Sequence, residues 1–279
     1  MRLGISTWVY FSHPVDEAVL RLARRGFRVL ELWADQSQLD PRLFPEAELS
    51  RVRELGARLG LTFYSFHAPF SGLDLASPKE EKREESVRVV VKASEYAAKL
   101  GCRFTVVHPG SSESMTVTGD AAEAEARGRL LEALSRLGEG AERHGVKVLL
   151  ENMTERDGRR YGSRIKDLRE TVKALGRGGF GLSLDPGHTV LSRLGVYDEL
   201  RETEGLLMSL HANDNDGLKD LHLVPMKTEA SIDWRRFLGV LEETGYSGPF
   251  MLEVYGGDTP DQVVEDARAL CEKLPGLQL

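Results

Sequence analysis

Short apolar segments alternate with amphipathic helical patterns along the whole chain. The apolar segments predict eight β-strands, and the third of them is rich in aromatic residues. The predicted strands span residues 2–6, 28–33, 61–67, 104–108, 147–151, 180–185, 206–211 and 249–253. The last five are continuous apolar runs, which is typical of a parallel sheet that is covered on both faces.

Helical patterns fill the intervals between these strands. Ser77 and Pro78 form a helix-start signal, because serine caps the first free N–H groups and proline suits the first turn. Gly26, Gly60 and Gly101 are expected to end helices. Helices are predicted over residues 14–25, 46–59, 77–100, 121–143, 163–175, 197–203, 233–244 and 258–274.

Eight strand–helix units in 279 residues predict one (β/α)8 TIM barrel domain over residues 1–279, an α/β fold. In such a barrel the active site lies at the C-terminal face of the strands. A doubly wound sheet is the alternative. It is disfavoured because no glycine-rich phosphate loop follows the first strand.

The bulk composition excludes several classes of protein. A net charge of −7 disfavours nucleic-acid binding through a basic surface, but leaves room for a local basic rim. Cys102 and Cys271 match no zinc or redox spacing, so we expect a reducing compartment without disulfides. The first residues enter a strand directly, and we see no signal peptide or membrane-spanning helix. We therefore expect a cytoplasmic protein with no membrane partner.

Six consecutive predicted strands end on a residue that can bind a metal. Such matches are improbable by chance in a chain with 44 Asp and Glu and 7 His residues among 279. The carboxyl ends of barrel strands meet on one face, so these side chains become neighbours although they lie far apart in sequence. The residues are His67, His108, Glu151, Asp185, His211 and Glu253.

Three further candidates follow these strand ends. His188 comes three residues after Asp185, and Asp220 and His222 lie two residues apart, so in an extended segment both would point to one side. Imidazole and carboxylate ligands suit zinc, manganese, iron or cobalt, and the lack of thiolates favours a catalytic site over a structural one. For His67 and His108, contact with a substrate is the alternative.

Other residues near the predicted face have two interpretations. Arg156, Arg159 and Arg160 form a basic run in the fifth βα loop, where solvated charge is the default and a phosphate contact is the alternative. His13 and His144 are interpreted as non-functional. Four aromatic residues either form an apolar wall for a sugar ring or pack the barrel top: Trp8, Trp33, Phe66 and Phe70.

Several of these motifs together resemble the xylose isomerase-like barrel superfamily. That group includes sugar-phosphate isomerases and epimerases, ketose 3-epimerases and endonuclease IV. The resemblance covers residues 2–270 and rests on His-Ala-Pro-Phe, Leu-Ala-Ser-Pro, His-Pro-Gly, Leu-Glu-Asn, Asp-x-x-His, His-x-Asn-Asp, Asp-x-His and Leu-Glu-Val.

The epimerase branch implies one divalent metal (zinc, manganese, cobalt or magnesium) and a carbohydrate substrate. The metal would polarise the substrate carbonyl as a Lewis acid. One glutamate would remove a proton to give an enediolate, and the other would return a proton from the opposite side. The resemblance implies Glu151, Asp185, His211 and Glu253 as metal ligands, Glu151, Glu253 and His188 as catalytic residues, and Trp8, Trp33, His67, His108 and Arg156 as substrate contacts.

The endonuclease branch implies three zinc ions and abasic DNA as the partner. His67, His108 and Glu151 would hold the first ion. The four epimerase ligands would hold the second. His188, Asp220 and His222 would hold the third, and the cluster would activate water.

Departures from the endonuclease motifs favour the isomerase branch. Residues 153–156 read Met-Thr-Glu-Arg where endonuclease IV has Thr-Ala-Gly-Gln, and Asp-Pro-Gly-His replaces Asp-Thr-Cys-His. Asn-Asp-Asn-Asp-Gly at 213–217 and Ile-Asp-Trp at 232–234 resemble isomerase-like members, although their Pro-Gly-x-Gly segment is missing. Dehydratases, aldolase-like enzymes and a non-enzymatic binding protein are the remaining alternatives. The pattern does not fix whether the chain forms a homo-oligomer.

Overall fold

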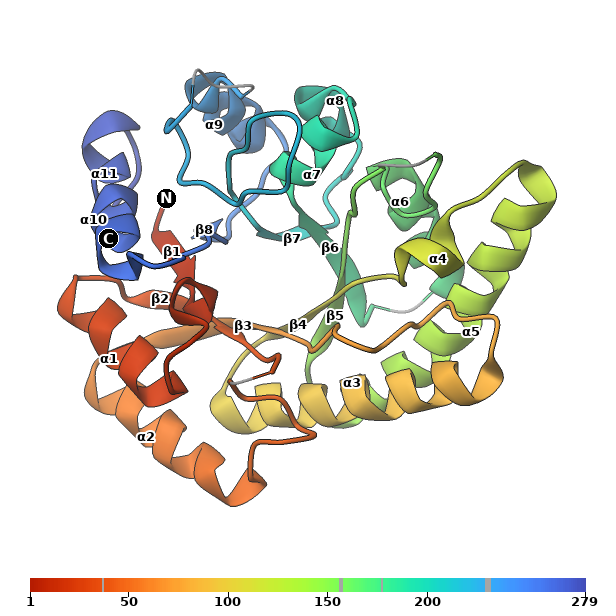
Figure 1. The fold of residues 1–279 in the computed structure, drawn as a ribbon, viewed down its shortest axis with the longest axis horizontal. Coiled ribbons are helices and arrows are strands. Elements are labelled where there is room, and N and C mark those ends of the chain that lie inside the picture. The colour runs from red at the N-terminus through yellow and green to blue at the C-terminus, as the bar shows by residue number, and fades with distance from the viewer. Residues whose placement is uncertain (37, 156–157, 177, 229–231) are drawn as a thin grey trace.

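Eight parallel strands form a nearly closed barrel in the computed structural model, which describes residues 1–36, 38–155, 158–176, 178–228 and 232–279 (Figure 1). The strands are β1 (Leu3–Ser6), β2 (Val29–Trp33), β3 (Thr62–His67), β4 (Phe104–Val107), β5 (Lys147–Glu151), β6 (Phe180–Leu184), β7 (Leu207–Leu210) and β8 (Phe250–Leu252). Ladders join them in the order β7-β6-β5-β4-β3-β2-β1-β8. The predicted TIM barrel is therefore confirmed, and the doubly wound alternative is wrong.

The barrel closes between β7 and β8 through a single bridging residue beyond β7. The Ala212 amide donates to the Met251 carbonyl at 2.8 Å, and the Glu253 amide donates to the Ala212 carbonyl at 3.3 Å. This closure brings the ends of β7 and β8 together, so His211 and Glu253 become neighbours. The two chain ends also meet, because the Leu3 amide donates to the Gln278 carbonyl at 2.7 Å.

Helices surround the strands on the outside (Figure 1). The longer ones are α1 (Val15–Arg24), α2 (Leu49–Arg58), α3 (Glu80–Leu100), α5 (Asp120–Arg143), α6 (Ile165–Leu175), α9 (Trp234–Glu243) and α10 (Pro260–Arg268). Shorter ones are η1 (Thr7–Tyr10), η2 (Glu46–Glu48), α4 (Ser112–Met115), α7 (Pro186–Leu191), α8 (Val196–Arg201) and α11 (Leu270–Lys273). The sequence pattern did not predict η1, α4 and α7, which are each a single turn or slightly more.

Several predicted boundaries need correction. The third helix starts at Glu80 rather than at Ser77, since the Ser77 hydroxyl accepts from the Lys79 amide at 3.2 Å and closes a turn before the helix. The fifth predicted helix, observed as α6, starts at Ile165, and the last predicted helix is divided into α10 and α11 at Ala269. No helix among the described residues is long and apolar enough to span a membrane.

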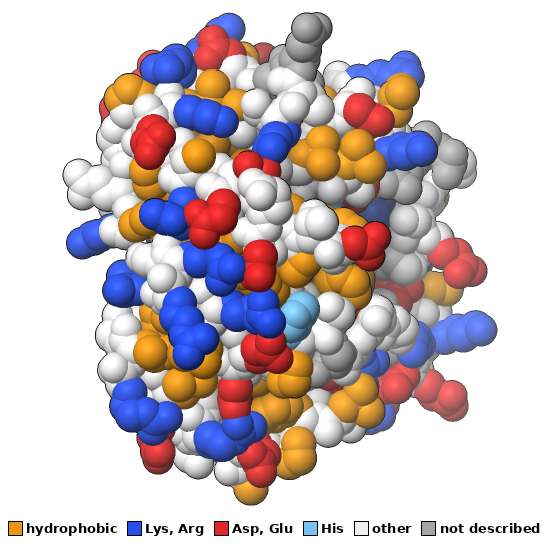
Figure 2. Space-filling model, turned by 60° about the vertical axis from the view of Figure 1, so that its left-hand side comes forward, with side chains coloured by type: hydrophobic (Ala, Val, Ile, Leu, Met, Phe, Trp, Pro, Cys, Tyr) orange, Lys and Arg blue, Asp and Glu red, His pale blue; other side chains and the backbone are white. Residues whose placement is uncertain are grey.

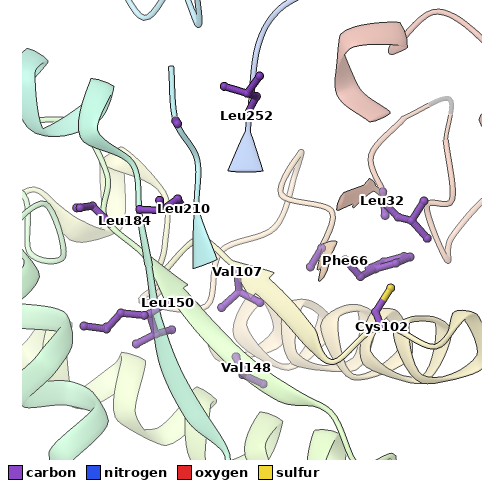
Figure 3. Packing of buried hydrophobic residues seen from close by; sticks show 14 of the residues in the cluster. Leu32, Phe66, Cys102, Val107, Val148, Leu150, Leu184, Leu210 and Leu252 are labelled. Atoms are coloured by element: carbon purple, nitrogen blue, oxygen red, sulfur yellow. The ribbon is translucent and has the colours of Figure 1, made fainter. Parts of the chain in front are cut away.

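The main hydrophobic core lies between the strands and the helices. Leu32, Phe66 and Cys102 belong to it on one side of the barrel, and Leu150 and Leu184 on another (Figure 3). A smaller cluster fills the barrel interior, formed by Tyr64, Phe104, Val106, Leu149 and Met251. Figure 2 shows Lys and Arg side chains interspersed with Asp and Glu on one face of the molecule, without a continuous basic surface there.

Irregularities in β3 and β7 decide which way two histidines point. In β3 the register with β2 skips Tyr64, and in β7 the register with β6 skips Met208. An extra residue in a strand reverses the alternation of side chains beyond it. Three residues beyond each skipped position, His67 and His211 therefore face the barrel interior, whereas a regular strand would turn them toward the helices.

We predict that Leu150→Ala destabilises the barrel by about 2–5 kcal/mol, because Leu150 is fully buried in the main core and its loss leaves a cavity. Leu43→Ala is the control, since Leu43 is 70% exposed. Denaturant unfolding of both variants measures the difference. Equal unfolding midpoints for the two variants would contradict the assigned core.

Candidate metal centre

A cavity of about 1010 Å³ opens at the C-terminal ends of the strands. Trp8, Trp33 and Phe70 provide apolar side chains to its wall. Seven of the nine predicted ligands line it: His67, His108, Glu151, His188, Asp220, His222 and Glu253. The other two, Asp185 and His211, have no exposed surface.

Four of the predicted ligands form the centre of the cluster. Glu151, Asp185, His211 and Glu253 each offer one ligand atom, and these atoms all lie within 4.8 Å of one another. The Nδ1 atom of His211 lies 3.0 Å from Oε1 of Glu151 and 3.3 Å from Oε2 of Glu253. This is the set that the epimerase resemblance implies for a single metal.

His67 and His108 approach the same carboxylate from the other side. The Nε2 atom of His67 lies 3.3 Å from Oε2 of Glu151, and Nε2 of His108 lies 3.4 Å from that same oxygen. Because Oε1 faces His211, the two oxygens of Glu151 face different histidines. Each oxygen of Glu151 could therefore serve as a ligand atom for a cation.

The remaining predicted ligands gather around Asp220. Its Oδ2 lies 3.3 Å from Nε2 of His188, and its Oδ1 lies 3.3 Å from Nε2 of His222. Asp185, His188 and His222 form a further group with ligand atoms within 4.8 Å. The structure thus brings all nine predicted residues into one place.

Asp220 and His222 come together without the extended segment that would point both side chains to one side. Neither residue lies in a strand, and His222 has a φ of 46°, a left-handed conformation that costs a non-glycine residue roughly 1 kcal/mol or more. The two side chains meet because the loop turns there. The Nδ1 atom of His222 is held by the Glu253 carbonyl at 3.0 Å.

Backbone carbonyls orient three of the histidines. In each case Nδ1 contacts a carbonyl oxygen, which fixes the ring and leaves Nε2 toward the cavity. The pairs are His67 with Ala68 at 2.9 Å, His188 with Asn152 at 2.8 Å, and His222 with Glu253 at 3.0 Å.

The start of α7 positions Asp185 and His188. Asp185 is the N-cap, with Pro186 in the first turn, and its Oδ1 accepts from the His188 amide at 2.8 Å. Its Oδ2 accepts from Asn213 at 2.7 Å. Gly187 is required here, because a Cβ atom would lie 2.0 Å from Oδ1 of Asn213.

Glu31 is a buried residue of this region that the sequence reasoning missed. Its Oε2 accepts from Nε2 of His211 at 3.1 Å and from the Ser65 hydroxyl at 2.7 Å. Glu31 is fully buried, although it lies in the apolar strand Val29–Trp33. A single charged residue within an apolar strand was the sequence signal that could have identified Glu31.

The carboxylates make the cluster favourable for positive charge. Burial lowers the pKa of His67, but its contact with Glu151 and the charge on Glu253 outweigh burial and raise the pKa to about 9. Burial dominates at His108 and lowers its pKa to about 4. Burial also raises the pKa of Glu253, whereas at Glu151 the neighbouring histidines outweigh burial and lower the pKa.

The residues present fit a divalent cation. Among the described residues, Oε1 of Glu151 and Nδ1 of His211 are buried without a partner in hydrogen-bond geometry, although they lie only 3.0 Å apart. Buried polar atoms normally have such partners. Two ligand atoms that share a cation would face each other in this way. Imidazole and carboxylate donors suit zinc, manganese or cobalt.

Some of the predicted aromatic residues and histidines lie in the cavity wall, and others lie elsewhere. Trp8 lies 4.8 Å from His222 between ring centroids, and Phe70 stacks on His108 at 4.6 Å, so both belong to the cavity wall. Phe66 instead packs in the core. His13 is absent from the cavity lining given by the described residues, and His144 caps the C-terminus of α5.

The basic run of the fifth loop is only partly described. Arg156 lies outside the described residues. Arg159 pairs with Asp167 of α6 at 2.7 Å, so its charge is balanced by the neighbouring helix. Arg160 is buried, lines the cavity and donates to the Gly110 carbonyl at 2.7 Å.

Comparisons with known proteins agree with this geometry. The chain is 28% identical to an uncharacterised protein of Methanocaldococcus jannaschii, over 91% of this chain and 83% of that protein. It is also 28% identical to a probable endonuclease 4 of Thermotoga maritima, over 72% of this chain and 71% of that one. Among solved structures, a D-tagatose 3-epimerase-like protein matches with a TM-score of 0.82 and 26% identity, covering 98% of this chain and 96% of that one.

A family model also matches most of the chain. The model describes a xylose isomerase-like TIM barrel, and it matches residues 19–274, a segment that contains all nine candidate ligands. The match therefore includes strands β2 to β8 and the cluster at the C-terminal face of the barrel. The chain belongs to the xylose isomerase-like TIM barrel family.

Proposed function

We propose that this protein is a divalent-metal-dependent isomerase or epimerase that acts on a sugar or a sugar phosphate. The observation that carries the proposal is the pair of carboxylates of Glu151 and Glu253, which face Nδ1 of His211 from different strands. The similarity to a D-tagatose 3-epimerase-like structure supports it.

Two carboxylates suit the removal of one proton from a carbon and the delivery of another proton to its opposite face. Glu151 ends β5 and Glu253 follows β8, so the two side chains enter the site from separate parts of the barrel. One takes the proton from the carbon next to the substrate carbonyl, and the other delivers a proton to the opposite face. A divalent cation held by Glu151, Asp185, His211 and Glu253 would supply polarisation of the carbonyl.

The cavity wall suits a sugar. Trp8 and Trp33 offer apolar surface to the C–H face of a ring or chain, and His108 and His188 offer nitrogen atoms to its hydroxyl groups. His188 would hydrogen-bond a substrate oxygen through Nε2, while its Nδ1 stays fixed by the Asn152 carbonyl. Binding inside this cavity orients the substrate and removes water from the reacting carbon.

A zinc-dependent phosphodiesterase acting on abasic DNA is the second candidate. It is favoured by the group of Asp185, His188 and His222 beside Asp220, which could hold cations that a one-metal epimerase does not need. The similarity to a probable endonuclease 4 also supports it. The number of bound ions separates the two candidates.

We predict that the metal-loaded protein incorporates solvent deuterium into a ketose at the carbon next to the carbonyl. NMR of a ketose and aldose panel in D2O measures this exchange. Glu253→Gln should slow it by about 10²–10⁴-fold, the usual contribution of a general acid or base. Glu54→Gln is the matched control, because Glu54 is exposed on α2, and it should leave the rate unchanged.

The absence of exchange with every sugar of the panel, in protein shown to contain metal, would contradict the epimerase proposal. Exchange that survives Glu253→Gln unchanged would instead remove this residue from the proton transfer.

We predict about one tightly bound divalent ion per chain after loading with zinc, manganese or cobalt and dialysis. Elemental analysis measures the content. The double variant Glu151→Ala, Asp185→Ala should lose the ion, because it removes two central ligands, whereas Glu54→Ala should keep it. Wild-type protein that retains no metal would contradict the proposal. About three zinc ions, with salt-sensitive cleavage of an abasic duplex, would favour the phosphodiesterase.

A further inference from the structure

We propose that Glu31 is a positioning residue that holds His211 in the tautomer needed at the metal centre. Its carboxylate keeps the proton on Nε2 of His211 and directs the Nδ1 lone pair toward Glu151 and Glu253. The inference rests on the proposed function, because it concerns a ligand of the proposed metal.

The contact reaches across the barrel. Glu31 lies in β2, His211 follows β7, and the ring order places β8 and β1 between these strands. The Nε2–O distance is 3.1 Å, and both side chains are fully buried. The irregular register at Met208 turns His211 inward, but it does not decide which ring nitrogen faces the ligands. Rotation by 180° about the Cβ–Cγ bond would replace Nδ1 by a carbon atom.

A second hydrogen bond fixes the carboxylate itself. The Ser65 hydroxyl donates to the same Oε2 atom at 2.7 Å. Ser65 follows Tyr64, the residue that the β3 register skips, so the local irregularity also turns this hydroxyl toward Glu31. Ser65 therefore fixes the oxygen of Glu31 that in turn accepts the hydrogen bond from His211.

His211 differs in its partner from His67, His188 and His222. His67, His188 and His222 use Nδ1 to contact a backbone carbonyl, and they present Nε2 to the cavity. His211 uses Nε2 to contact the carboxylate of Glu31, and its Nδ1 faces the carboxylate of Glu151. A carboxylate partner fixes the tautomer and also makes the imidazole a stronger metal ligand.

The burial of Glu31 also needs an explanation. A carboxylate inside a protein loses its hydration, and the loss is offset only by good partners. Among the described residues, Oε1 of Glu31 is buried without a hydrogen-bond partner. An apolar side chain would pack into β2 without this cost, so the charge is best explained by its effect on His211 and on the cation beyond it.

The test compares metal affinity in wild-type protein, Glu31→Gln and Glu199→Gln. Glutamine keeps the size of the side chain and removes its charge. Glu199 is a matched control, because it is partly buried and accepts from the Ile165 amide at 2.6 Å, away from the cluster. Metal-free proteins are titrated with zinc in competition with a chromophoric chelator, and cobalt absorption spectra are recorded in parallel.

Glu31→Gln should weaken zinc binding about 10–100-fold and alter the cobalt spectrum, while Glu199→Gln should change neither. Wild-type affinity and spectrum in Glu31→Gln would overturn the role of Glu31 and leave the proposed function intact. Failure of wild-type protein to bind zinc or cobalt would overturn both.

A second measurement needs no variant of Glu31. Nitrogen-15 NMR of the zinc-loaded wild-type protein, with His211 assigned by comparison with His211→Gln, should show His211 protonated at Nε2. His67, His188 and His222 should be protonated at Nδ1. A zinc-loaded His211 protonated at Nδ1 would overturn the proposal even if Glu31→Gln failed to fold.

Discussion

The contact of His211 with the carboxylates of Glu151 and Glu253 is the interaction on which the rest of the site depends. Several carboxylates buried this close together repel one another, and only positive charge between them makes the arrangement stable. A divalent cation held by His211 and these carboxylates would supply that charge. The irregular register of β7, the closure of the barrel at Ala212 and the hydrogen bond from Glu31 all act on this one contact.

The sequence predicted the fold and the composition of the cluster because both depend on local signals. Apolar runs mark the strands, and a parallel barrel brings their carboxyl ends to one face. Histidines and carboxylates at those ends, such as His67 after β3 and Glu151 in β5, therefore had to meet, whatever the details of the loops. The segment matched by the xylose isomerase-like TIM barrel model contains all of these residues.

Other features depend on contacts that no local pattern contains. The skipped residues Tyr64 and Met208 reverse the side-chain alternation, and they look like ordinary strand residues in the sequence. The left-handed turn at His222 is fixed by the loop around it, and the two-residue spacing of Asp220 and His222 does not reveal it. Glu31 reaches His211 from 180 residues away, and only the closed barrel shows that partner.

We propose that the carboxylates and the histidine at the barrel top hold a catalytic divalent ion. Anomalous diffraction from crystals of the protein grown with manganese and a bound ketose would test it most directly. We expect one strong anomalous peak among Glu151, Asp185, His211 and Glu253. The substrate carbonyl should lie beside it, with a carboxylate on each face of the adjacent carbon. A ketose bound in the cavity with no peak among these four residues would contradict it.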